Sequence, residues 1–281
     1  MALEAVKQHG YNAYKYISHE LQSDREILLE AVKDQNSLRF LASQYCADRE
    51  IVLQSVKFSG TTLEYASPEL QSDTEIVWEA VKQNGYSLSF ASNAFKKDRD
   101  LVLEAIKTNV NALNFVHPSI ANDRELISIA VKKDGLAIEH TTNETLKNER
   151  SLALEAVKSN GMALSSLPDA FKKDLEIVRV ATQNNIHALF KASASVTSNE
   201  EFMLEIISIN GQGLMFAHPE LKNSREFCLK AIQHNGFAIN YVQLPIDNEF
   251  IIEAVRQNGY CNVFSQELYQ IRMRECYNQI C

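Results

Sequence analysis

One pattern of apolar and polar residues recurs along the whole chain, at intervals of 23 to 26 residues. In the copy from Asp73 to Lys97, numbered from its acidic residue, positions 4, 5, 6, 8 and 9 are apolar. Positions 1, 3 and 7 are often acidic, and position 10 is basic in eight of eleven copies. Position 8 is occupied in turn by Ala5, Ala31, Ser55, Ala80, Ala105, Ala130, Ala156, Ala181, Ile206, Ala231 and Ala254. A fixed period of this length predicts a stacked array of repeats.

Each repeat opens with the signals of a helix of about three turns. An acidic residue at position 1 suits an N-cap, and lysine at position 10 suits the negative end of the helix dipole. Eight of the nine glycines then occupy position 13: Gly10, Gly60, Gly85, Gly135, Gly161, Gly211, Gly236 and Gly259. We expect these glycines to end the first helix as left-handed C-terminal caps.

The second half of each repeat predicts a shorter helix, with an aliphatic residue at position 16 and usually an aromatic one at position 18. Prolines end this helix in several copies: Pro68, Pro118, Pro168 and Pro219. A hairpin of about 25 residues cannot bury its own apolar face, so neighbouring copies must stack. The small residue at position 8 allows close helix contacts, and Val or Ile at position 9 fills the seam.

The predicted fold is therefore all-α, an α-solenoid of about ten to eleven helical hairpins of about 25 residues. We expect one domain over residues 1–264, with a truncated first repeat. Residues 265–281 are expected to form a capping helix or a degenerate repeat.

The phrase carried by Asp73 to Lys97 and by Asp98 to Asn122, close to D-R-E-x-V-L-E-A-V-K-x-N-G-x-A-L, resembles the repeats of the domain of unknown function 4116 (DUF4116) family. Each family module spans about two of the copies counted above, and the resemblance runs from Met1 to Phe264. It implies tandem arrays in large proteins of protists and of bacteria that live inside them, which suggests an effector role. The resemblance implies no known activity, ligand or catalytic residue.

Composition excludes several classes of function. The chain has 281 residues and a formal net charge of -8, which disfavours binding to a phosphate backbone. No apolar run reaches the roughly 20 residues of a membrane helix, and the start of the chain does not resemble a signal peptide. The five cysteines form no C-x-x-C pair, so we expect reduced thiols and no metal site. Together these features predict a cytoplasmic protein, in the host cytosol if it is a secreted effector.

The repeat pattern breaks in three consecutive copies. Position 18 is aromatic before and after them, but here it is His140, Ser166 and Lys191. In the copy that starts at Asp174, polar residues also replace the usual Val and Lys, and no glycine follows. We expect the stack to open, bend or become polar here, and the candidate binding residues are His140, Ser166, Thr182, Gln183, His187 and Lys191. A change of curvature, a drifted repeat and a ligand pocket all remain open. Catalysis is disfavoured because no acid follows the histidine and no glycine loop could bind an oxyanion.

Three other features have a structural and a functional interpretation. The lysines at position 10 could track a polyanion, but a glutamate three residues earlier predicts solvent-exposed ion pairs. Trp78 replaces a leucine and is expected in the core, whereas Tyr11, Tyr14 and Tyr16 could pack on another repeat or on a partner. These features do not change the general interpretation. We interpret the chain as a non-catalytic scaffold for protein–protein interaction. We expect a monomer with a protein partner, no cofactor, no nucleic acid and no membrane; the alternative is a small-molecule or enzymatic site around residues 140–191.

Overall fold

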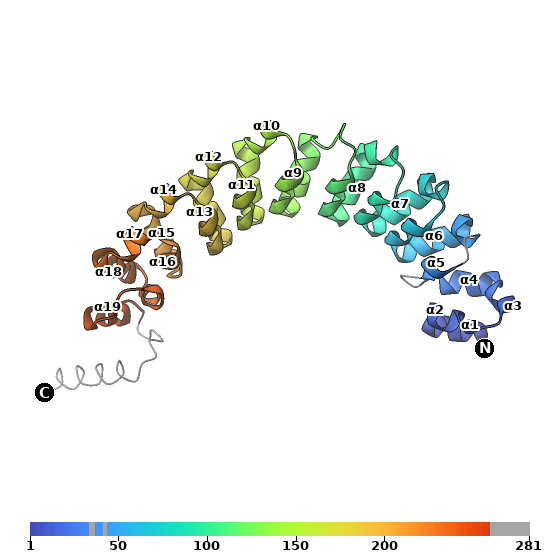
Figure 1. The fold of residues 1–281 in the computed structure, drawn as a ribbon, viewed down its shortest axis with the longest axis horizontal. Coiled ribbons are helices and arrows are strands. Elements are labelled where there is room, and N and C mark those ends of the chain that lie inside the picture. The colour runs from blue at the N-terminus through green and yellow to red at the C-terminus, as the bar shows by residue number, and fades with distance from the viewer. Residues whose placement is uncertain (34–36, 42–43, 259–281) are drawn as a thin grey trace. The chain divides into compact units, whose positions relative to one another are not determined.

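The described residues of the computed structural model, 1–33, 37–41 and 44–258, form helices and turns with no strand (Figure 1). The chain divides into two compact bodies, Met1–Leu146 and Lys147–Cys281, called here the N-terminal and C-terminal bodies. The all-α repeat architecture predicted from the sequence is confirmed. The prediction of a single domain stays a prediction, and residues 265–281, together with Gly259 and Phe264, lie outside the described residues.

Among the described residues, a repeat typically contains a long helix and a second short helix, and most repeats add a third helical turn. The long helices are α1 (Ala2–His9), α4 (Arg25–Ala31), α6 (Arg49–Phe58), α7 (Thr74–Gln83), α8 (Arg99–Thr108), α9 (Arg124–Lys133), α11 (Arg150–Ser159), α13 (Leu175–Asn184), α15 (Glu200–Ile209), α18 (Arg225–His234) and α19 (Asn248–Asn258). The second helices are mostly 3₁₀: α2 (Tyr11–Tyr14), α5 (Ser37–Phe40), η2 (Gly60–Tyr65), η4 (Gly85–Ser89), η6 (Val110–Phe115), η7 (Gly135–His140), η8 (Gly161–Ser166), η9 (Ile186–Lys191), α16 (Gly213–Phe216) and η10 (Gly236–Tyr241).

The third helical turn was not predicted from the sequence. Its examples are α3 (His19–Gln22), η1 (Tyr45–Ala47), η3 (Leu70–Ser72), η5 (Phe95–Lys97), α10 (Glu144–Lys147), α12 (Asp169–Lys172), α14 (Ala194–Thr197) and α17 (Pro219–Lys222). Proline was expected only to end the second helix, yet Pro219 is also the first residue of α17 and Pro168 is the N-cap of α12. Proline suits the start of a helix because its missing N–H needs no partner there.

The N-caps formed by aspartate at position 1 are confirmed, whereas the Glu149 side chain makes no cap hydrogen bond. Asp98 is typical: its Oδ1 accepts hydrogen bonds from the backbone N–H groups of Asp100 at 3.0 Å and Leu101 at 3.1 Å. Asn199 and Ser224 cap their helices in the same way. These bonds satisfy amide groups that have no partner inside the helix.

The predicted left-handed role of the glycines is wrong, because among the described residues only Gly10 has a positive φ, of 54°. In the typical repeat, Asn84 at position 12 is extended and its side chain caps the second helix by accepting from Tyr86 N at 3.0 Å. Gly85 follows, and a Cβ there would lie only 2.0 Å from the carbonyl oxygen of Ala105 in the next repeat. The glycine is therefore needed for close approach between repeats.

The side chain at position 11 of the next repeat forms hydrogen bonds at the same junction. Gln83 Oε1 accepts from Gly60 N at 2.7 Å, while its Nε2 donates to Phe58 O at 3.2 Å. Thr108 accepts from Gly85 N at 2.7 Å. A side chain of one repeat thus supplies hydrogen bonds that the end of the preceding long helix lacks.

The core follows the seam between consecutive long helices. Ala105 and Ala130 are fully buried, as their position predicts, and so are Ile106 and Val131 at position 9. Helix α7 packs between α6 and α8 in the N-terminal body, and α11 packs on α13 in the C-terminal body. Trp78, expected in the core, is only half-buried.

Candidate interaction surfaces

One edge of each body carries a ladder of arginines that links consecutive repeats. Arg49, at position 2, donates from Nε to Asp73 Oδ2 at 2.9 Å and from Nη2 to Glu75 Oε2 at 2.5 Å. The same pattern joins Arg25 to Asp48 and Glu50, Arg99 to Asp123 and Glu125, Arg150 to Asp174 and Glu176, and Arg225 to Asp247 and Glu249. Sequence reasoning missed this ladder, although arginine after the capping acid was the available signal.

The ladder changes the electrostatics of the capping acids. The hydrogen bond from Arg49 is the main cause that lowers the pKa of Asp73, and the bond from Arg25 does the same for the pKa of Asp48. In four repeats the arginine's place is taken by Thr74, Leu175, Glu200 or Asn248, and these side chains cannot form the same ion pair. Arg179 pairs instead with Glu205, with Nε 2.6 Å from Oε1.

Three of the lysines at position 10 lie in ion pairs at the predicted spacing. Lys33, Lys82 and Lys107 each contact the glutamate three residues earlier, at N–O distances of 2.7, 3.3 and 3.0 Å. These side chains are largely exposed, so the pairs are weak. The positive charge of these three lysines is nevertheless matched locally, which interrupts the basic stripe that a polyanion requires.

Of the sequence-predicted site residues, His140 is half-buried at the end of η7 in the N-terminal body, and the other five belong to the C-terminal body. Thr182 is buried on α13, where its hydroxyl donates to Arg179 O at 2.8 Å. Its polar group is thus satisfied inside the helix rather than facing a ligand. Gln183 and Lys191 are exposed, and Ser166 is half-buried at the end of η8.

His187 belongs to a ring cluster on the second helices. Its ring stacks on Phe190 with centroids 6.2 Å apart and meets the edge of Phe216 at 5.5 Å. Phe190 and Phe216 pack at right angles, 4.6 Å apart. The structure therefore joins η9 and α16 through aromatic contacts, and the exposed Lys191 follows Phe190 in the sequence.

The aromatic residues at position 18 do not lie in the core in most copies. Tyr65, Phe90 and Phe115 are only half-buried, although Phe216 is buried. A polar residue at this position therefore needs no buried partner, because the side chain reaches the surface. The loss of the aromatic at three positions does not by itself require the stack to open.

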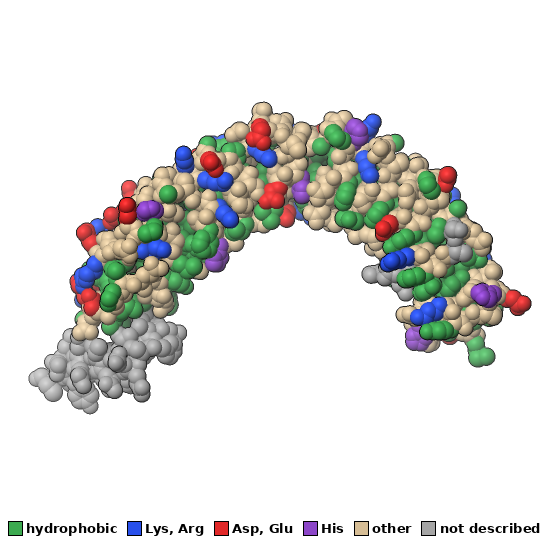
Figure 2. All heavy atoms as spheres, in the orientation of Figure 1, with side chains coloured by type: hydrophobic (Ala, Val, Ile, Leu, Met, Phe, Trp, Pro, Cys, Tyr) green, Lys and Arg blue, Asp and Glu red, His purple; other side chains and the backbone are tan. Residues whose placement is uncertain are grey.

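Large apolar side chains are exposed next to the ring cluster. Phe190 and Ile209 are each 62% exposed, and Phe237 and Met215 are also exposed. Figure 2 shows hydrophobic side chains over the region of α13 to α16. We call the exposed side chains of Phe190, Ile209, Met215 and Phe237 the aromatic surface of the C-terminal body.

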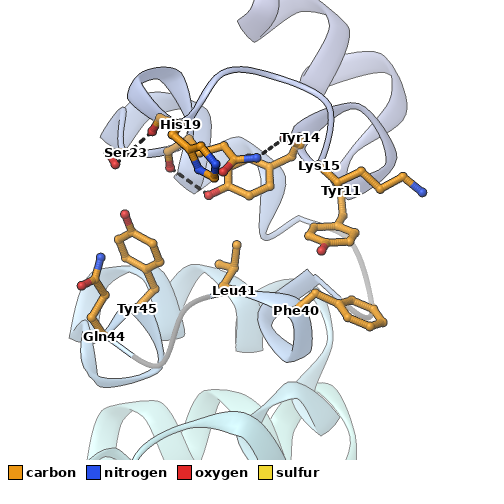
Figure 3. Close-up of a pocket in the computed structure, with 10 residues that line it drawn as sticks. Tyr11, Tyr14, Lys15, His19, Ser23, Phe40, Leu41, Gln44 and Tyr45 are labelled. Atoms are coloured by element: carbon orange, nitrogen blue, oxygen red, sulfur yellow. Dashed lines mark hydrogen bonds between the residues drawn. The ribbon is translucent and has the colours of Figure 1, made fainter.

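A cavity of about 380 Å³ lies between the first two repeats of the N-terminal body (Figure 3). Tyr11 stacks on Phe40 at its rim, with centroids 5.0 Å apart, and Leu41 and Tyr45 face it from the second repeat. Tyr14 is buried, and its hydroxyl donates to Gln22 O at 2.8 Å. Burial raises the pKa of Tyr14 to about 12, so this hydroxyl stays protonated as a structural donor.

The described residues include two cysteines and no arrangement typical of a metal site or of a membrane-spanning helix. Cys46 and Cys228 are free thiols, and burial raises the pKa of both. Over residues 1–33, 37–41 and 44–258 no group of three His, Cys, Asp or Glu side chains is arranged to hold a metal ion. Within the same ranges no helix is long and apolar enough to cross a membrane.

The family described as Domain of unknown function (DUF4116) matches five tandem segments: residues 1–45, 48–96, 98–147, 149–196 and 199–245. Each segment spans two of the repeats, and all five begin at the N-cap residue of a long helix. No curated protein and no solved structure matches the chain. Because the five segments cover most of its length, the chain belongs to the DUF4116 family.

Proposed function

We propose that the protein is a non-catalytic repeat scaffold that binds a protein partner through the aromatic surface of the C-terminal body. The observation that carries the proposal is the exposure of Phe190, Ile209, Met215 and Phe237 on neighbouring repeats. Exposed apolar side chains that gather in one place are typical of interaction sites, and aromatic residues dominate binding energy at protein interfaces.

The remaining surfaces support the same assignment. Each ladder arginine described above contacts two carboxylates of the next repeat, as Arg49 does with Asp73 and Glu75, so these ladder units carry no excess of positive charge. The net charge of -8 argues against a nucleic-acid partner. We therefore propose a protein partner, with no nucleic acid, membrane or cofactor involved, and a monomeric scaffold.

A cytoplasmic location is part of the proposal. The free thiols of Cys46 and Cys228 suit a reducing compartment. An effector role in a host cytosol rests only on the organisms in which, by the family resemblance, such repeats occur. No feature of these residues adds to it.

The alternative of a small-molecule or enzymatic site around residues 140–191 has less support. Thr182 is satisfied within its own helix, and His187 packs in the ring cluster. Neither side chain is arranged with an acid, a nucleophile or a bound-anion site, as catalysis would require.

Affinity capture from a lysate of the source cells, with the chain as bait, tests the proposal. Phe190→Ser and Lys191→Glu are expected to abolish capture of the partner while the thermal midpoint stays nearly unchanged, because both side chains are exposed. Phe58→Ser is the matched control, since Phe58 is 50% exposed but belongs to the N-terminal body. Equal capture by the wild type and Phe190→Ser would contradict the proposal.

A further inference from the structure

Two consecutive repeats of the C-terminal body meet at a groove of about 290 Å³. It is lined by Ile209, Asn210, Gly211 and Gln212 from one repeat and by Asn235, Phe237, Asn240 and Tyr241 from the next. Carboxamides make up half of this lining, and none of its side chains is charged at neutral pH. The groove therefore suits a neutral ligand that forms hydrogen bonds.

Internal hydrogen bonds fix the orientation of two of these amides. Asn210 Oδ1 accepts from Gln212 N at 3.0 Å, and Asn235 Oδ1 accepts from Phe237 N at 3.1 Å. With each oxygen engaged, the Nδ2 group of the same side chain is the part left to donate. Asn235 Nδ2 uses one N–H for a long bond to Ser208 O, at 3.5 Å, and retains the other.

Other side-chain donors of the groove have no hydrogen-bond partner among the residues that the structure describes. Across the described residues, the NH₂ groups of Asn210, Gln212 and Asn240 make no hydrogen bond to the protein. Ile209 is 62% exposed and Phe237 is 49% exposed beside these amides. The groove thus offers oriented N–H donors next to apolar side chains.

We propose that this groove binds a short stretch of extended peptide, whose backbone carbonyl oxygens accept hydrogen bonds from Asn210 and Asn235. The proposal rests on the proposed function and specifies the partner's chemistry at one part of that surface. Backbone carbonyls are neutral, strong acceptors, whereas an anion would require the positive charge that this lining lacks.

The geometry of an extended chain fits the two kinds of side chain in the groove. Carbonyl groups on one side of such a chain recur about every 6.6–6.8 Å, and its side chains alternate between faces. Apolar side chains of the peptide can therefore pack on Ile209 and Phe237 while its carbonyls meet the amides. The volume lies near the lower limit of ligand pockets, about 300 Å³, so the groove takes only a few residues of the peptide.

A random library of twelve-residue displayed peptides, selected on the full chain, provides the probe. Selected peptides are then labelled with fluorescein, and their binding is measured by fluorescence anisotropy. Asn210→Asp and Asn235→Asp are expected to weaken binding at least about tenfold each, because the donor is lost and a carboxylate faces the carbonyl oxygen.

A natural aspartate at the equivalent position indicates that these variants still cap the second helix. Asp134 occupies the same repeat position, and its Oδ1 accepts from Leu136 N at 3.0 Å. Asn109→Asp is the matched control, since Asn109 makes the equivalent bond to Asn111 N at 3.0 Å in the N-terminal body. This control is expected to leave peptide binding unchanged.

Selection of no peptide by the wild type would overturn the proposal, as would peptides that bind Asn235→Asp and the wild type equally. Binding of a neutral oligosaccharide, tested with cellohexaose and chitohexaose and lost in Asn235→Asp, would reassign the groove to sugars. If Phe190→Ser abolishes partner capture but Asn235→Asp leaves it and peptide binding intact, the scaffold function stands and the peptide groove is wrong.

Discussion

Replacement of Gly85 by alanine tests whether close approach, rather than backbone conformation, requires glycine at position 13. The added Cβ would lie 2.0 Å from Ala105 O and 2.7 Å from the carbonyl carbon, where ordinary contact begins at 3.4 Å. Both atoms belong to backbone, so the clash cannot be relieved by a side-chain rotation. The two repeats would have to separate by roughly 1 Å at a fully packed seam.

The expected cost follows from two opposing effects. Overpacking of this kind destabilises by about 1–3 kcal/mol or more, whereas loss of glycine freedom in the unfolded chain stabilises by about 0.4–1 kcal/mol. We expect Gly85→Ala to lower the free energy of unfolding by about 2 kcal/mol. With an m value of about 1–3 kcal/mol/M, the urea midpoint should fall by about 1 M.

Trp78, the single tryptophan, lies in the same repeat as Gly85 and reports its unfolding by fluorescence, with far-UV circular dichroism as a second probe. Gly213→Ala is the matched control, because a Cβ there would lie 3.2 Å from side-chain atoms of Ile206 and Ile207 that can adjust. Its dichroism midpoint should change little. Equal shifts for the two variants, or a higher midpoint for Gly85→Ala, would refute the close-approach explanation.

Two further predictions concern the seam and the ladder. Ala105→Leu should lower the free energy of unfolding by about 1–3 kcal/mol in urea melts, because Ala105 is fully buried. Lys107→Ala should lower it by less than about 1 kcal/mol, because its ion pair is exposed. Equal effects would contradict the burial assignment. Since the pKa of Asp73 is lowered in the folded state, chiefly by Arg49, its ion pair stabilises the fold above the unfolded pKa of about 3.9 and is lost as pH falls through the lower folded value. Arg49→Met should therefore lower the urea midpoint at pH 7, and this deficit should shrink as the pH falls below about 3.9. A deficit that stays constant over this range would show that the ladder does not act through Asp73.

The sequence alone determined the features that depend on local physics. Aspartate at position 1 has to cap a helix because its carboxylate reaches the free amides of the first turn, as at Asp98. Alanine at position 8, as at Ala105, falls on the apolar stripe of the helix and is buried. The period itself required stacking, so the all-α repeat architecture could be predicted without coordinates.

The tertiary structure alone decided which atoms of neighbouring repeats meet. Gly85 was attributed to a left-handed cap because that is the local reason for glycine after a helix, but its actual neighbour is Ala105, 20 residues later. The bond from Arg49 to Asp73 spans 24 residues, a separation at which no local rule pairs side chains. These contacts depend on the offset between stacked repeats.

For the candidate site as well, the sequence showed the local features and the tertiary structure showed the contacts between repeats. The sequence indicated an irregular region that includes His187 and Lys191, but its pattern could not show that the position-18 ring lies at the surface. Nor could it show that Asn210 and Asn235 line one groove, since each asparagine has a sufficient local role as a cap. Whether a capping amide also faces a groove depends on the neighbouring repeat, because stacking places the next repeat's side chains opposite it.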